Sequence, residues 1–422
     1  MTVQEHAMRP QAAYDISVLG LGHRQQRSRT GVFRVVEEVA LQLMKSPEIG
    51  LQLWSGPEYA KLRSAIEYLD CNLLGAVPVN ASSMQRCLQR LASAGCAPRL
   101  LGKAVHWTMR RARRDDIQYN RHWLKDANIF HSPYFQLPPT GCFQAGTRKF
   151  ITVFDLIPIL HPEYFKSDAN HPIKKLVLGL NPQDWVICIS EYTRSDLLAY
   201  RPDLNPEKVF AIPLAASESF YPCSDQDQMA TARRTYGVPN APYVLGLSTL
   251  EPRKNIAQTI RCFARLITEQ KIDDLNLVLA GVRGWDVEEI FSEVKQFPKL
   301  EKRIFVTGYV ADKDLAALYS GALAFVYPSF YEGFGLPPLE AMQCGVPTIT
   351  SNTSSLPEVV GDAGIMVAPT DGDALCDSLW RLYSSAELRA NLSAKARDRA
   401  KQFTWHKTGR GTIAAYEVAL SS

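Results

Sequence analysis

The sequence of 422 residues predicts an α/β protein with two doubly wound parallel sheets that face a central cleft. Short apolar runs alternate with helix-like segments, a polar stretch at 215–241 interrupts this rhythm, and the same alternation then starts again. Such alternation is typical of parallel sheets that are covered by helices on both faces. The length fits two or three domains.

The first predicted domain, residues 1–214, contains apolar strands at 15–20, 51–54, 128–132, 149–155, 185–190 and 209–213. Helices are expected at 32–44 and 193–200. Ser190 or Thr193 is expected to cap the second of these helices, because hydroxyl side chains bond free N–H groups at helix starts. Glu191 and Arg194 either touch substrate or pair with each other.

The stretch 215–241 is rich in Ser, Asp, Gln, Pro and Asn, and it is predicted to be a linker with one helical turn at 233–237. The second predicted domain, 242–402, contains strands at 243–248, 275–281, 304–307, 322–327 and 347–351, each followed by helix-like sequence. A last segment, 403–422, is expected to form a closing helix at 404–418.

The composition is that of an ordinary globular protein, with 46% hydrophobic and 21% charged residues. No apolar run is long enough to predict a membrane-spanning helix, and residues 1–14 lack the apolar core of a signal peptide. The nine cysteines are scattered and form no C-x-x-C pair. A reducing, cytoplasmic location is therefore expected.

One segment, 84–125, carries ten Lys or Arg and two Asp, although the whole chain has a net charge of only +4. Leucines and Trp107 are interleaved with the charges. This pattern fits docking on an anionic membrane surface, such as the inner face of a cell membrane, and equally fits a solvated helical insertion. No nucleic-acid-binding motif accompanies the charge, so nucleic acid is not an expected partner.

The most informative stretch is 326–364, where Glu332 and Glu340 are eight positions apart. A turn, Gly333-Phe334-Gly335, lies between a buried strand and a helix that is expected after two prolines. Glycine lets a ligand approach the backbone, and the N–H groups and dipole of a helix start favour phosphate. Glu332 would then face the group that the phosphate carries, and Glu340 would accept hydrogen bonds from ribose hydroxyls.

Arg253 and Lys254 follow a strand and open a helix. Adjacent cations are unfavourable at a helix start unless an anion binds there, and a diphosphate would satisfy this requirement. No His cluster with metal-ligand spacing accompanies these motifs, so no divalent metal is predicted.

These motifs resemble the E-x7-E region of retaining glycosyltransferases of the GT-B fold, family 4 (glycosyl transferases group 1), and the resemblance covers about 16–416. It implies that Glu332 contacts the donor sugar and Glu340 the ribose. It also implies that Arg253 and Lys254 hold the donor diphosphate in place of a metal. The last helix is expected to return to the first domain. Backbone and glycine contacts to the donor are expected from Gly31, Gly281, Tyr309, Val310, Gly333, Phe334, Gly335 and Leu336.

The acceptor side departs from the pattern of similar enzymes. They often have His-Asp where this chain has Phe154 and Asp155. Asp155 is expected either to orient the acceptor hydroxyl or to cap the following turn. His131 and His161 are the alternative candidates, although a histidine at a strand end is more often structural.

The resemblance implies a transferase that moves a hexose from a nucleotide-diphosphate sugar to a glycan or lipid-linked glycan, without a cofactor or metal. The Leu156-Ile157-Pro158 and Gly284-Trp285 features resemble bacterial mannosyltransferases of surface-polysaccharide assembly, which favours GDP-mannose. A UDP-sugar-dependent transferase remains an alternative, as does a catalytically silent sugar-nucleotide-binding scaffold, which Phe154 motivates. A GT-B epimerase is disfavoured by the E-x7-E and Arg-Lys motifs.

Overall fold

The computed structural model describes residues 9–24, 31–56, 59–72, 124, 126–164, 171–284, 292, 295 and 298–422. All structural statements below concern these residues. The basic segment predicted at 84–125 lies outside them except for Leu124, and so does Trp285 of the Gly-Trp feature.

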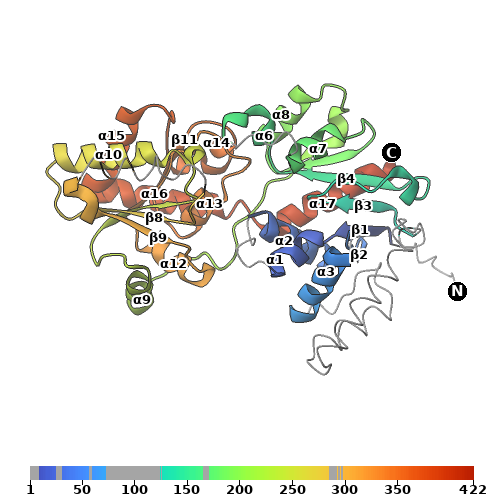
Figure 1. Ribbon diagram of the computed structural model, residues 1–422, viewed down its shortest axis with the longest axis horizontal. Coiled ribbons are helices and arrows are strands. Elements are labelled where there is room, and N and C mark those ends of the chain that lie inside the picture. The colour runs from blue at the N-terminus through green and yellow to red at the C-terminus, as the bar shows by residue number, and fades with distance from the viewer. Residues whose placement is uncertain are drawn as a thin grey trace.

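Two six-stranded parallel sheets form the two halves of the molecule, which lie side by side (Figure 1). The first sheet has the order β2-β1-β3-β4-β5-β6. Its strands are β1 (Gln11–Asp15), β2 (Gly50–Trp54), β3 (Ile129–Ser132), β4 (Arg148–Val153), β5 (Trp185–Cys188) and β6 (Val209–Ala211). The helices of this half are α1 (Ser17–Arg24), α2 (Gly31–Lys45), α3 (Tyr59–Cys71), α6 (Ile157–Leu160), α7 (Pro172–Leu178) and α8 (Glu191–Tyr200).

The second sheet has the order β12-β11-β10-β7-β8-β9. Its strands are β7 (Tyr243–Leu247), β8 (Asn276–Ala280), β9 (Ile304–Gly308), β10 (Ala324–Tyr327), β11 (Thr348–Ser351) and β12 (Ile365–Val367). The helices of this half are α9 (Gln226–Tyr236), α10 (Ile256–Glu269), α12 (Asp312–Ser320), α13 (Leu336–Gln343), α14 (Leu356–Val360), α15 (Gly372–Ser384) and α16 (Ala386–Ala400). Parallel pairing throughout both sheets confirms the predicted α/β class. None of the described helices is long and apolar enough to span a bilayer.

Two predicted elements are wrong in position. The strand expected at 15–20 is β1, which ends at Asp15, and α1 begins two residues later. Asp15 Oδ1 accepts hydrogen bonds from the backbone N–H of Ser17 at 2.8 Å and from its hydroxyl at 2.5 Å, and this capping turn starts a helix where apolarity alone indicated a strand. In the predicted linker, the turn expected at 233–237 is the end of α9, which Asp225 caps at its start and left-handed Gly237 at its end.

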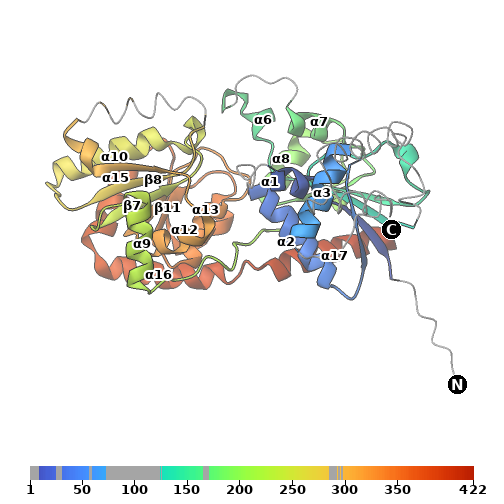
Figure 2. The same ribbon diagram turned by 60° about the horizontal axis from the view of Figure 1, so that its bottom comes forward.

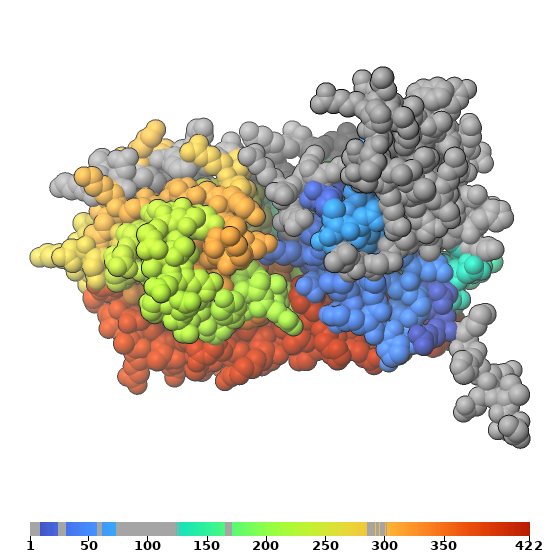
Figure 3. Space-filling view, turned by 90° about the horizontal axis from the view of Figure 1, so that it is seen from below, coloured from blue at the N-terminus to red at the C-terminus, as the bar shows by residue number. Residues whose placement is uncertain are grey.

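The last helix, α17 (Trp405–Ser421), packs against the first half, while α16 lies along the second (Figure 2). Seen from below, this C-terminal segment runs along both halves (Figure 3). The Tyr416 hydroxyl lies 2.6 Å from Nδ1 of His131, whose Nε2 lies 2.8 Å from Thr152 Oγ1. Burial lowers the pKa of His131 to about 3, so this imidazole is a neutral structural link between α17 and the first sheet.

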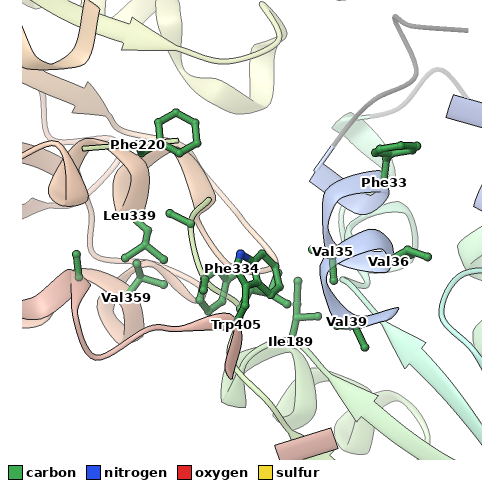
Figure 4. Close-up of a cluster of buried hydrophobic side chains, with 14 of the residues drawn as sticks. Phe33, Val35, Val36, Val39, Ile189, Phe220, Phe334, Leu339, Val359 and Trp405 are labelled. Carbon is green, nitrogen blue, oxygen red and sulfur yellow. The ribbon is translucent and has the colours of Figure 1, made fainter. Parts of the chain in front are cut away.

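Where the halves meet, Phe334 of the second half lies with Trp405 between α2 of the first half and Leu339 and Val359 of the second (Figure 4). These four apolar residues and Val35 of α2 are all buried. This apolar contact fixes the Gly333-Phe334-Gly335 turn directly beside the first half.

Candidate active site

The predicted donor residues gather at the C-terminal ends of β7 and β10, which are neighbouring strands of the second sheet. After β7 the chain forms a short 3-10 turn, Pro252–Lys254, and after β10 it reaches Glu332. Ligands of open parallel sheets bind at this edge, because the loops that follow the strands gather there. The two motifs found in the sequence therefore form one site.

Asn255 fixes the turn that carries Arg253 and Lys254. It lies in the left-handed region at φ 56°, which Asn tolerates better than most residues. Its side-chain amide donates to the carbonyls of Pro328 at 3.1 Å and Pro369 at 2.7 Å. These bonds tie the Arg-Lys turn to the loop after β10, so the two cations are held against Glu332.

Glu332 is buried, and four side chains converge on its Oε1 oxygen. The cations are Lys254 at 2.6 Å and Arg253 at 3.0 Å. The hydroxyls of Ser329 and Tyr327 donate at 2.6 and 2.9 Å. None of these contacts uses Oε2, so one carboxylate oxygen is left outside the cluster.

The charges around Glu332 decide its ionisation. Burial alone would raise its pKa, but Arg253 and Lys254 outweigh burial and hold the pKa at about 2. For Lys254, burial and the neighbouring Arg253 lower the pKa. Arg253 is further anchored by Glu251 at 2.6 Å and by the carbonyl of Tyr331 at 2.5 Å. The site is a cluster in which two cations, Arg253 and Lys254, lie against two carboxylates, Glu251 and Glu332.

Gly333 is where the donor loop touches the first half. A Cβ atom at this position would lie 2.2 Å from the carbonyl oxygen of Phe154 and 3.0 Å from Cβ of Asp155, so no side chain fits there. The carbonyl of Gly333 accepts hydrogen bonds from the hydroxyls of Ser190 at 2.7 Å and Thr193 at 3.2 Å. The first half therefore holds the backbone of this loop through two hydroxyl side chains.

The rest of the turn leads into α13. Gly335 has φ 110°, a value that L side chains rarely adopt, and Leu336 begins the helix. Behind the turn, the hydroxyl of Ser355 donates to the carbonyls of Glu332 and Phe334, both at 2.9 Å. These contacts hold the backbone of the predicted diphosphate loop in one conformation.

Glu340 lies on α13 and is 5% exposed. Its Oε2 accepts a hydrogen bond from Tyr319 at 3.1 Å, and its Oε1 lies 3.2 Å from Arg34. Burial raises the pKa of Glu340 to about 7, although Arg34 and Tyr319 act to lower it, and nearby Asp312 adds to the rise. This glutamate is far easier to protonate than Glu332.

The sequence did not single out Arg34. It lies on α2 of the first half, one turn after Gly31, and its guanidinium reaches Asp312 at 2.5 Å as well as Glu340. A Cβ atom at Gly31 would lie 3.4 Å from Leu336, so the start of α2 abuts the start of α13. The signal missed was an arginine one helical turn after Gly31, which was itself expected to contact the donor.

On the acceptor side, Asp155 caps the following turn by accepting from the N–H of Ile157 at 3.0 Å. Burial raises its pKa, Arg253 opposes this rise, and Glu332 adds to it. These charges place Asp155 beside the donor cluster. Phe154 packs edge-on against Tyr134, with ring centroids 6.4 Å apart.

A second feature that the sequence did not indicate is an aromatic contact between the halves. Tyr331 packs against His161 and Tyr192, with ring centroids 4.8 and 5.7 Å apart. The hydroxyl of Tyr331 donates to Asp196 on α8. His161 therefore lies near the site, whereas His131 is part of the structural link to α17.

The remaining predicted residues lie after β8, after β9 and at the start of α8. Tyr309 is 64% exposed and Val310 is buried after β9, and a Cβ atom at Gly281 would lie 1.8 Å from the carbonyl oxygen of Ser248. Ser190 caps α8, as predicted, and Glu191 lies 3.7 Å from Arg194. Among the described residues, no group of three or more His, Cys, Asp or Glu side chains is arranged to hold a metal ion.

The family described as "Glycosyl transferases group 1" matches residues 229–399. The chain is 35% identical over 291 residues to O-antigen chain mannosyltransferase B of Escherichia coli, an alignment that covers 69% of this chain and 74% of that protein. The chain belongs to the glycosyl transferases group 1 family. It is also 30% identical over 272 residues, or 64% of its length, to serotype-specific mannosyltransferase WbdA of E. coli, of which it spans only 33%.

Solved structures support the fold of this group 1 glycosyltransferase. A glycosyltransferase from Rickettsia africae superposes with a TM-score of 0.66 at 15% identity, covering 98% of this chain and 99% of that one. WaaG, a glycosyltransferase involved in lipopolysaccharide biosynthesis, superposes with a TM-score of 0.61 at 12% identity, covering 96% and 98%. These likenesses and the two sheets confirm the predicted GT-B fold.

Proposed function

We propose that this glycosyltransferase is a retaining mannosyltransferase that moves mannose from GDP-mannose to a glycan or lipid-linked glycan. The observation that carries the proposal is the cluster of Arg253, Lys254 and Glu332, buried at the sheet edge and beside the glycine turn. Mannose is favoured because the E. coli relatives are named mannosyltransferases. The guanine base follows only from the sequence resemblance.

In the proposed reaction, the bond between the sugar anomeric carbon and the diphosphate oxygen breaks while a bond to the acceptor hydroxyl oxygen forms on the same face. The acceptor proton passes to the leaving phosphate oxygen. Arg253 and Lys254 are fixed where the negative charge of the leaving group develops, which is the arrangement that stabilises a transition state most effectively. We propose that these two cations do this without a metal.

Glu332 has two roles in this proposal. Through Oε1 it keeps both cations fixed, and through Oε2 it accepts hydrogen bonds from the hydroxyls of the donor sugar. Asp155, which lies beside Gly333, orients the acceptor hydroxyl. Glu340 accepts from the ribose hydroxyls, and the backbone of the turn holds the diphosphate.

The test is nucleotide release from GDP-, UDP-, ADP- and dTDP-sugars, with a membrane lipid extract as acceptor. Glu332→Ala is the inactive control, and Glu387→Ala, which changes an exposed glutamate of α16, is the matched control. Release from GDP-mannose that Glu332→Ala abolishes and Glu387→Ala preserves supports the proposal. Release from a UDP-sugar instead replaces the donor, and inversion at the anomeric carbon of the product overturns retention.

A catalytically silent sugar-nucleotide-binding scaffold is the second candidate, and Phe154 favours it because it offers no hydrogen bond to the sugar. This candidate predicts thermal stabilisation by free nucleotide without release from any donor. Phe154→His then tests whether an imidazole at this position creates turnover.

We also propose that the basic segment 84–125 places the enzyme on an anionic membrane surface at the inner face of the cell membrane. The support is its local charge, because the segment lies outside the described residues. Neutralising Arg110, Arg111, Arg113 and Arg114 is expected to abolish salt-sensitive binding to anionic vesicles. Unchanged binding contradicts this location.

A further inference from the structure

Arg34 lies in the first half and forms ion pairs with two carboxylates of the second half. Its guanidinium lies 2.5 Å from Oδ1 of Asp312, at the start of α12, and 3.2 Å from Oε1 of Glu340 on α13. Both carboxylates belong to the second sheet's helices, whereas α2 packs on the first sheet. One cation therefore links the two halves at the glutamate proposed to bind ribose.

The local sequence explains why Arg34 reaches this far. α2 starts at Gly31, and the start of this helix lies against Leu336, the first residue of α13. Side chains of a helix point back toward its N-terminus, so Arg34, one turn in, is directed at this contact. Its neighbours Phe33, Val35 and Val36 are buried and fix the helix, and Figure 4 shows Val35 on the side facing Phe334.

The ionisation of Glu340 depends on the positive charge of Arg34. The charged or titratable groups that face it are Arg34 of α2, Asp312 and Tyr319 of α12, and Cys344 after α13. Of these, Arg34 is the group whose charge favours an ionised Glu340, because Asp312 repels it and Tyr319 contributes only a hydroxyl donor. Burial already favours the neutral acid.

The ionisation of Glu340 matters for ribose binding. An ionised carboxylate accepts hydrogen bonds at both oxygens, and such charge-assisted bonds are stronger than neutral ones. A protonated carboxyl has an O–H of its own and loses part of its capacity to accept. With Arg34 on Oε1 and Tyr319 on Oε2, each oxygen of Glu340 still has a lone pair for a ribose hydroxyl.

We propose that Arg34 is a donor-positioning residue, which keeps Glu340 ionised for the donor ribose. This inference rests on the proposed function, because it takes Glu340 as the ribose ligand. Arg34 acts through Glu340 and Asp312 rather than on the reacting atoms.

The test compares the affinities of Arg34→Gln, Arg34→Lys and the wild type for GDP, with UDP in parallel, by isothermal titration calorimetry from pH 6 to 9. The variant-to-wild-type ratio at each pH cancels the titration of the nucleotide's own phosphate. We expect Arg34→Gln to bind about tenfold more weakly at pH 7 and to recover most of this loss at pH 9. The reason for this direction is that loss of Arg34 makes Glu340 hold its proton to higher pH, and alkali removes that proton. Arg34→Lys is expected to retain much of the affinity.

Two controls separate this role from a structural one. Arg63→Gln removes an arginine of similar exposure that pairs with Glu67 within α3 at 2.8 Å, and it is expected to leave the affinity unchanged at every pH. In the Glu340→Gln background, Arg34→Gln is expected to add no further pH dependence. Affinity loss that is equal at all pH values, or no loss at all, overturns the inference.

The failure of this inference is distinguishable from that of the proposed function. Wild-type turnover of a nucleotide sugar together with a flat affinity ratio for Arg34→Gln overturns only the role of Arg34. Wild-type protein that binds neither GDP nor UDP overturns the proposed function, and the role of Arg34 falls with it. Arg34→Lys keeps the test usable if Arg34→Gln folds poorly.

Discussion

The surroundings of Glu332 and Glu340 shift the pKa of a glutamate side chain in opposite directions. The two glutamates are 8% and 5% exposed, so burial penalises both charges. Yet the pKa of Glu332 is held at about 2, while that of Glu340 is raised to about 7. Burial alone therefore does not determine how a carboxylate behaves in this cleft.

The difference is the balance of charge around each glutamate. Glu332 has two cations within 3.0 Å and two hydroxyl donors. Glu340 has one cation, at 3.2 Å, which is shared with Asp312. A buried carboxylate with surplus positive charge is locked in its ionised form, and one with a shared cation is poised to titrate.

The largest expected effect comes from Glu332→Gln. This change leaves Arg253 and Lys254 buried beside a neutral amide, so we expect a loss of about 3–5 kcal/mol in the free energy of unfolding. We also expect turnover to fall at least about 100-fold, because the cations lose their fixed positions. Urea unfolding and initial rates with the preferred donor measure the two effects. A stable, active Glu332→Gln variant would show that the cluster is not what organises the site.

A smaller effect is expected from Lys254→Met, which keeps the volume of the side chain and removes one of the two charges. Arg253 still holds Glu332, so the fold is expected to lose only about 2 kcal/mol. Turnover is expected to fall about 100-fold with little change in the Michaelis constant for the acceptor. Steady-state kinetics with each substrate varied in turn check this. An unchanged kcat contradicts the proposed role of Lys254 at the leaving group.

The sequence predicts the parts of this site that depend on local patterns, and it misses those that depend on contacts between distant segments. Glu332, Arg253 and Lys254 lie in loops after strands of one sheet, and parallel strands bring such loops to one edge. The fold class was predicted from the alternation of apolar runs and helix-like segments, and the rule on strand ends accounts for the clustering of these residues. The turn Gly333-Phe334-Gly335 was also predicted, because local glycine spacing indicates close backbone approach.

Arg34 was not predicted, because its partners lie 306 and 278 positions away, on helices of the other half. No local periodicity carries the information that α2 meets α13, and this contact depends on how the halves pack. The start of α1 was missed for a different reason. Its capping bond from Ser17 to Asp15 acts within an apolar run that a strand explains equally well.

Glu340→Gln sharpens the comparison from the side of binding. We expect the Michaelis constant for the donor to rise about tenfold while kcat changes little, because the ribose remains bound in the transition state as in the ground state. Initial rates at several donor concentrations measure this. If kcat falls as steeply as in Glu332→Gln, the two glutamates share one role and the contrast between them fails.

The stability of Glu340→Gln relative to the wild type is expected to change with pH. Because the folded-state pKa of Glu340 is raised from 4.5 to about 7, the native state binds more protons than the unfolded state between these values. Wild-type stability therefore includes a term that decreases as pH rises from 4.5 through 7.

Gln at position 340 removes this term, and Arg34 keeps Asp312 as its partner. From pH 5 to pH 8, we expect the wild type to lose about 2 kcal/mol of stability relative to Glu340→Gln. Glu332 has the opposite sign: its lowered pKa contributes stability above pH 4.5 that is lost as pH falls toward 2. Thermal unfolding of Glu340→Gln and the wild type at pH 5 and 8 measures the Glu340 term. A stability difference that does not change with pH would mean that Arg34 already keeps Glu340 fully ionised.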